Sequence, residues 1–244
     1  MRPHRPHRDI KSVYTSIKST AVVCAFLCGF VFAAPNDIFQ GLKMEELKQE
    51  LARRLSPSYP DMDSFFGSQA VSVERLTTPF FTGAAIAKVV NRGGRTERTS
   101  YVGVSGKDFA IFLSGDPEAF ERLALSAQVN LSSDELRLAF VRTMLETTAN
   151  LNFRFRLMAS SIEIIDRPGA PAEQISRNAD VRKRYAQIVT RPSIVAAGSV
   201  WRIVHFALIG QDLLRLDVDL SPDGKVHIEK TVLEKDLALS FTLG

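Results

Sequence analysis

Residues 213–233 read LLRLDVDLSPDGKVHIEKTVL, and this stretch decides the fold class of the chain. Apolar and polar side chains alternate on both sides of a short loop, which is the pattern of two β-strands that each bury one face. Matching the apolar positions pairs Leu220 with Val226 and leaves Pro222-Asp223-Gly224 as the loop. Gly224 suits the left-handed last position of such a three-residue loop. The sequence therefore predicts an antiparallel hairpin in this register.

This register brings four ionisable side chains together on the exposed face of the hairpin. Asp219 is expected opposite His227, and Asp217 opposite Glu229. Opposed carboxylates repel each other, and a divalent cation with oxygen and imidazole ligands would relieve the repulsion. The alternative is a solvated face on which Arg215 and neighbouring lysines screen the acids. Asp217, Asp219, His227 and Glu229 thus form a candidate polar patch, and we predict no resident metal or other cofactor.

The rest of the chain alternates between helical and strand periodicity. Residues 57–69, which contain two prolines, are expected to form a loop. The order of elements indicates an α+β fold, an antiparallel β-sheet with helices packed on one face. The expected helices cover residues 36–54, about 117 onward, 132–148 and 172–189, and the expected strands cover 71–76, 82–91, 99–104, 109–113, 153–157, 194–209, 213–220 and 225–233.

Residues 34–244 are expected to form a single α+β domain. Their general arrangement is similar to that of cystatin-like and NTF2-like folds. This similarity concerns the layout of elements alone, so it implies no function.

The helix expected over residues 132–148 has the clearest start signal in the chain. Ser132 with Glu135 three residues later forms a capping box, and Leu131 with Leu136 forms the matching hydrophobic staple. We therefore expect Ser132 to be the N-cap of this helix.

Residues 1–33 have the order of a secretory signal peptide. A polar, basic segment is followed by about a dozen apolar residues, and Val31 and Ala33 stand at the positions that precede a cleavage site. An uncleaved membrane anchor would need about 20 apolar residues, and a mitochondrial presequence would not run into a compact apolar segment with a cleavage site. We expect cleavage near Ala33–Ala34 and an extracytoplasmic protein, secreted or periplasmic, with no membrane span after cleavage.

Removal of residues 1–33 would change the cysteine content and the net charge of the chain, and both limit the kinds of partner that it can bind. Both cysteines, Cys24 and Cys28, lie there, as do five of the 31 basic residues and one of the 27 acidic residues. The remaining chain has no thiol for disulfides or metal binding, and its charge is close to zero. A neutral chain argues against a nucleic-acid partner, because neutralisation of phosphates supplies most of that affinity.

Three arginines and a set of aromatic residues are further candidates for binding. Arg92, Arg95 and Arg98 surround a Gly-Gly turn and are a candidate contact for an acidic partner; the alternative is a solvated hairpin tip. The aromatic residues either line an apolar cavity or fill the core. This set comprises Phe65, Phe66, Phe80, Phe81, Phe153, Phe155 and Trp201.

The sequence contains none of the common motifs of zinc proteases or serine hydrolases. We expect an exported, non-enzymatic binding or assembly module that acts on a protein partner or a small apolar ligand. The alternative is a secreted hydrolase that uses Ser, Asp or Glu, with His205 or His227 as the base. A cleft lined by His205 and carboxylates would favour the enzyme, whereas a dry apolar cavity would favour binding.

Overall fold

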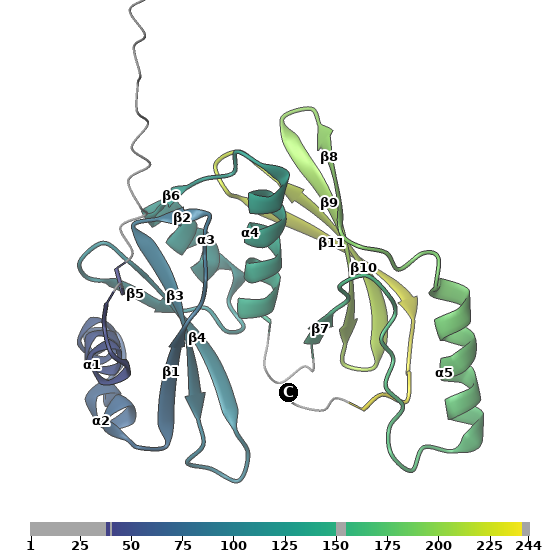
Figure 1. Cartoon of the computed structure of the whole chain (residues 1–244), viewed down its shortest axis with the longest axis horizontal. Coiled ribbons are helices and arrows are strands. Elements are labelled where there is room, and N and C mark those ends of the chain that lie inside the picture. Colours follow the sequence, from purple (N-terminus) through teal and green to yellow (C-terminus); the bar gives the residue numbers. More distant parts are fainter. Residues whose placement is uncertain (1–37, 40, 150–154, 241–244) are drawn as a thin grey trace, which may run out of the picture. The chain divides into compact units, whose positions relative to one another are not determined.

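The strands of the chain pair in antiparallel sheets (Figure 1). The computed structural model describes residues 38–39, 41–149 and 155–240, which all belong to one compact unit, Ala34–Gly244. The predicted signal peptide and its cleavage site lie outside the described residues. Among the helices of the described residues, none is both long enough and apolar enough to cross a membrane.

The N-terminal sheet is buried on both faces, because successive residues of β3 (Ala84–Asn91) contact different helices. Ile86 packs in the cluster of α3 (Pro117–Ser126) and α4 (Asp134–Thr147), whereas Ala87 packs in the cluster of α1 (Met44–Leu55) and α2 (Met62–Gly67). The strands are antiparallel, in the order β1 (Val71–Arg75), β3, β4 (Arg98–Ser105) and β5 (Phe109–Phe112). A separate pair joins β2 (Phe81–Thr82) to β6 (Gln128–Val129).

β4 approaches α3 most closely at Gly103. A Cβ atom on Gly103 would lie 2.5 Å from the Leu123 Cδ2 atom and 3.3 Å from Leu113 Cδ2. Both leucines are fully buried. A larger residue at position 103 would therefore require the buried Leu123 side chain to shift.

The central strand of the C-terminal sheet is β9 (Val200–Ile209). Two short strands pair with different parts of one of its edges. β7 (Phe155–Leu157) pairs with residues 207–209, and β8 (Ser193–Ala197) pairs with residues 200–204. On its other edge β9 pairs with β10 (Asp212–Leu220), which pairs in turn with β11 (Val226–Glu234).

The two faces of the C-terminal sheet contact different helices. Leu214, Leu216 and Val218 of β10 pack in the cluster that contains α4, whereas Leu213 packs in the cluster that contains Val181 of α5 (Ala172–Tyr185). The α4 cluster also contains residues of β3. α3 and α4 therefore contribute to one core that includes side chains of both sheets.

Of the predicted aromatic residues, Phe80 and Phe81 lie in this core, whereas Phe65 and Phe66 pack in the cluster of α1 and α2. The ring centroid of Phe140 lies 5.3 Å from that of Phe80 and 5.3 Å from that of Phe120, with nearly perpendicular planes. Edge-to-face packing of this kind is the favoured arrangement of aromatic pairs. Phe153 lies outside the described residues.

The predicted α+β class with antiparallel pairing is confirmed, and so is the register of the hairpin. β10 and β11 pair Leu220 with Val226, Asp219 with His227 and Asp217 with Glu229. Gly224 has φ +84°, in the left-handed region. The structure differs from the single sheet with helices on one face that the sequence predicts, because the strands form two main sheets and helices contact both faces of each.

The predicted N-cap of α4 is wrong by one residue. Ser133 is the cap: its Oγ accepts a hydrogen bond from the Leu136 N–H at 3.3 Å, and the helix begins at Asp134. The N–H of Ser132 donates to Oδ1 of Asn130 at 3.1 Å. This Asx turn holds Ser132 outside the helix and moves its start by one residue.

Three other predicted boundaries also differ. α1 begins at Met44 because the Glu46 carboxylate accepts a hydrogen bond from the Lys43 N–H at 2.7 Å, which caps the helix there. The segment 57–69, expected to be a loop, contains α2. The segment expected as one strand over 194–209 turns back at Gly198, with φ +65°, to form β8 and β9.

Candidate functional site

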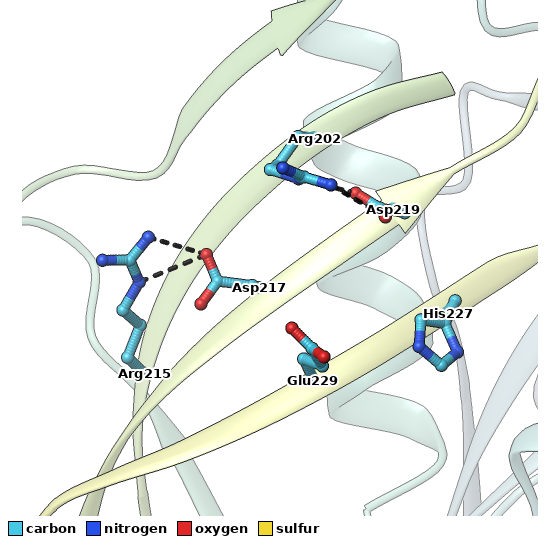
Figure 2. A pocket seen from close by; sticks show the side chains of 6 residues that line it. All are labelled: Arg202, Arg215, Asp217, Asp219, His227 and Glu229. Atoms are coloured by element: carbon cyan, nitrogen blue, oxygen red, sulfur yellow. Dashed lines mark hydrogen bonds and ion pairs between the residues drawn. The ribbon is translucent and has the colours of Figure 1, made fainter. Parts of the chain in front are cut away.

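The structure places the four residues of the predicted polar patch around one hollow, together with two arginines. Arg215, Asp217 and Asp219 alternate along β10 with buried side chains, so they lie on the face opposite α4. A hollow of about 440 Å³ opens over this face (Figure 2). We call its lining residues the charged patch: Arg202, Arg215, Asp217, Asp219, His227 and Glu229.

Two arginines bind the two aspartates of the charged patch. Arg202 Nε lies 2.9 Å from Asp219 Oδ1, and a second hydrogen bond joins the same side chains at 3.3 Å. Arg215 donates to Asp217 Oδ1 from two nitrogens, at 2.7 and 3.2 Å. The patch is therefore a set of largely neutralised charges rather than a group of repelling acids.

Arg202 is the residue that sequence reasoning missed. It lies directly opposite Asp219 in the pairing of β9 with β10. The two-residue turn at Gly210-Gln211 sets this register, because it pairs Ile209 with Asp212 and so places Arg202 opposite Asp219. The guanidinium of Arg202 lowers the pKa of Asp219, and the nearby charge of His227 acts in the same direction.

The remaining acid and the histidine have no such partners. Within the described residues, the side chains of His227 and Glu229 form no hydrogen bond or ion pair, and they lie on one face of β11. Among the same residues, no group of three or more His, Asp or Glu side chains is arranged to hold a metal ion. The patch could exchange its internal ion pairs for those of a charged partner, at the cost of breaking the existing ones.

His205, the other candidate base, lies in the core. It is only 2% exposed and shares the α4 face of β9 with Ile203 and Ala207. Neither ring nitrogen has a hydrogen-bond partner among the described residues. Burial, and to a smaller extent the positive charge of Arg142, lowers the pKa of His205 to about 4. The ring is therefore neutral at pH 7.

The arginine turn of the N-terminal sheet is separate from the charged patch. Arg92 donates to Glu97 at 2.8 Å and to Ser72 at 3.1 Å. Arg95 and Arg98 are exposed and line a hollow of about 580 Å³ at the hairpin tip. No described residue forms an ion pair with either, so an acidic partner could bind both.

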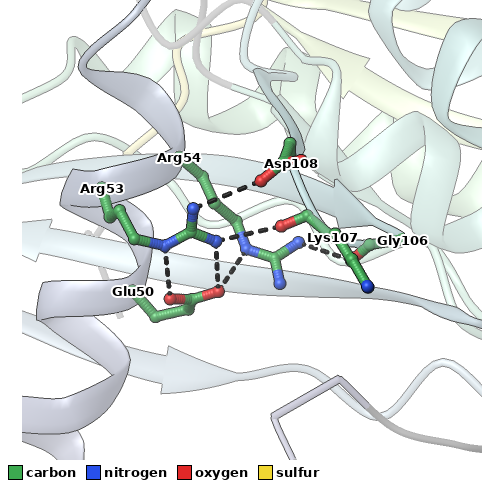
Figure 3. A network of polar contacts seen from close by, with 6 residues as sticks. All are labelled: Glu50, Arg53, Arg54, Gly106, Lys107 and Asp108. Atoms are coloured by element: carbon green, nitrogen blue, oxygen red, sulfur yellow. Dashed lines mark hydrogen bonds and ion pairs between the residues drawn. The ribbon is translucent and has the colours of Figure 1, made fainter.

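A further polar cluster holds α1 against the turn between β4 and β5 (Figure 3). Arg54 donates to Glu50 at 2.6 Å and to the Gly106 carbonyl at 2.8 Å. Arg53 donates to both carboxylate oxygens of Glu50 and to the Lys107 carbonyl. The hydrogen bond from Arg53, together with that from Arg54, lowers the pKa of Glu50 to about 2 despite partial burial. This cluster joins a helix to a turn and satisfies its own polar groups.

A pocket with a mostly apolar lining lies on the opposite face of the C-terminal sheet from the charged patch. Its volume is about 240 Å³. The ends of α3 and α4 form one wall, and the strands β7, β9, β10 and β11 form the other. We call this site the apolar pocket, and its lining residues are Gly115, Pro117, Leu145, Thr148, Ala149, Phe155, Ile209, Leu216, Ile228 and Lys230.

Of the predicted cavity-lining aromatics, Phe155 alone lies among these pocket residues. The pocket combines residues more than 100 positions apart in the chain, and no local pattern marks them. Trp201, which was also considered, instead lies beneath Arg137, whose guanidinium carbon is 4.0 Å from the ring centroid.

Comparison with known proteins identifies no relative. No protein-family model, no curated protein sequence and no solved structure matches this chain. A proposal about function has to be made from the site chemistry alone.

Proposed function

We propose that residues 34–244 act outside the cytoplasm as a binding module without catalytic activity, and that the apolar pocket holds a small apolar ligand. The observation that carries this proposal is the pocket itself. Ligand sites are typically concave and mostly apolar, with a few polar groups that orient the ligand. The apolar pocket has this composition, with Thr148 and Lys230 as its polar side chains.

The size of the pocket limits the ligand to a small molecule. Apolar cavities of about 150 Å³ can hold benzene, and one water-sized group takes about 30 Å³. A volume of about 240 Å³ therefore accommodates about eight such groups. This is below the range of drug-sized ligands, which begins at about 300 Å³.

The charged patch supports ligand binding less well. Its aspartates already accept charge-assisted hydrogen bonds from Arg202 and Arg215. A ligand would have to replace these contacts, whereas a ligand of the apolar pocket would add contacts without breaking any. Extracytoplasmic action is supported by the signal-like order of residues 1–33.

Ligand-detected NMR with benzene, hexanol and octanol tests the proposal. We expect at least one compound to bind and to raise the thermal unfolding temperature, because a ligand that binds only the folded state stabilises it. Ala149→Phe should fill the pocket and abolish binding. Ala196→Phe, at an exposed site on β8, is the matched control and should leave binding unchanged. Absence of binding by all three compounds, or binding that survives Ala149→Phe, would contradict the proposal.

A further inference from the structure

We infer that the ligand of the apolar pocket is a small anionic amphiphile, a carboxylate with a chain of about six to eight carbons. This inference rests on the function proposed above and specifies the chemical class of the ligand. The chain would lie among Leu145, Phe155 and Ile209, and the carboxylate would bind the ammonium group of Lys230.

Lys230 is the one charged residue in the lining of the apolar pocket. On β11 it lies opposite Leu216, which is buried and lines the same pocket. Glu229, its neighbour in sequence, lines the charged patch on the other face of the sheet. Among the described residues, no carboxylate forms an ion pair with Lys230, so its ammonium group is available to a ligand.

The opposite wall includes the start of α3. Gly115 and Pro117 belong to the N-terminal end of α3, where the helix dipole is positive. Asp116, between them, is already engaged: its carboxylate accepts a hydrogen bond from the Ala119 N–H at 3.0 Å and binds Arg122 at 3.1 Å. Asp116 is therefore paired rather than free to repel an anion.

The apolar wall and the volume define the rest of the ligand. Leu145, Phe155 and Ile209 offer contacts to a hydrocarbon chain, and about 240 Å³ holds about eight water-sized groups. Octanoate matches this size, while a long-chain fatty acid exceeds it. The alkyl chain of Lys230 can cover apolar surface while its ammonium group stays in water, where it can bind the carboxylate of an amphiphile.

Isothermal titration calorimetry of the full-length chain with octanoate, 1-octanol and octylammonium tests the inference. We expect octanoate to bind about threefold to fivefold more tightly than octanol, as one exposed ion pair allows, and octylammonium to bind more weakly than either. Lys230→Gln should reduce the affinity for octanoate to that for octanol and leave octanol binding unchanged. Lys225→Gln is the matched control, because Lys225 lies at the hairpin loop, binds Asp223 at 3.1 Å and is not a pocket residue.

The outcomes separate the two proposals. Equal affinity for octanoate and octanol, or octanoate binding that is unchanged by Lys230→Gln, overturns the anionic ligand and leaves the apolar pocket intact. Absence of binding by all three compounds, or binding that survives Ala149→Phe, overturns the pocket itself. Octanoate binding that is lost in Arg202→Gln and kept in Ala149→Phe assigns the anion to the charged patch and overturns both.

Discussion

Because of His205, lowering the pH should destabilise this protein well above the pH at which the carboxylate groups of the protein are protonated. The ring is buried beside α4, makes no hydrogen bond with the described residues, and has a pKa of about 4. In the unfolded chain a histidine has a pKa of about 6.5. Because the unfolded state binds the proton more readily, stability is highest above pH 6.5 and decreases as the pH falls toward 4.

The size of this effect follows from the two pKa values. The difference between about 4 and 6.5 corresponds to a loss on the order of 3 kcal/mol between pH 7.5 and pH 4, of which about 2 kcal/mol is lost by pH 5. Charged groups around the ring do not offset it. Arg142 of α4 disfavours the protonated ring, and its own partner is Glu146 at 2.9 Å. A loss of this size is a large part of the stability of an ordinary domain.

Urea denaturation at pH 7.5, 6 and 5 measures the effect. Some carboxylates have lowered pKa values, such as Glu50 and Asp223, both at about 2. Their protonation destabilises the fold mainly below pH 5, so it adds little to the change in stability between pH 7.5 and 5. His205→Leu removes an unsatisfied polar ring from the core, so its stability should be nearly constant from pH 7.5 to 5. Ile203→Val, at the neighbouring buried position on the same face of β9, changes no titratable group and should keep the wild-type dependence.

Two results would refute this reasoning. One is a wild-type stability that does not change between pH 7.5 and 5. The other is a His205→Leu variant that loses stability as steeply as the wild type, which would place the titrating group elsewhere.

Other predictions test the packing, the helix cap and the export signal. Gly103→Ala should destabilise the fold by about 1–3 kcal/mol in chemical denaturation, because its new methyl group would overlap Leu123; an unchanged stability would show that this leucine can move away. Ser133→Ala should lower stability by about 1 kcal/mol and Ser132→Ala by clearly less, and equal losses would contradict the N-cap assignment. Intact-mass measurement on protein from its native host should show the loss of residues 1–33, about 3.5 kDa at typical residue mass; an intact chain in the cytosol would contradict export.

The hairpin could be predicted because its information is local. Alternation along β10 and β11 defines the buried face, and Gly224 fixes the turn, so the register of Asp219 with His227 follows from about 20 consecutive residues. The charge balance of the same patch could not be predicted in full. It depends on Arg202, which lies on β9, and its place opposite Asp219 follows only when β9 is paired with β10 through the turn at Gly210-Gln211.

Some helix boundaries were predicted wrongly because neighbouring residues carry nearly equal start signals. Ser132 and Ser133 are adjacent and both precede acidic residues, so the choice of cap depends on the Asn130 side chain. α2 has six residues and follows Asp61, whose φ of +68° is unusual for a residue other than glycine. The apolar pocket could not be predicted from the sequence, because helices and strands distant in sequence meet there. Periodicity specifies which face of an element is buried but not which element covers it.

The core shared by α3, α4 and both sheets has a consequence for how the protein could be divided. A chain cut between Ala149 and Phe155 would separate the C-terminal strands from the helices that cover them, and each piece would expose its half of one core. Each fragment should be less stable alone than in the whole protein, because the cluster that contains α4 is divided between them. Mixed together, the two fragments should associate and refold. Reassembly of the split protein would then report directly that its two fragments have bound each other.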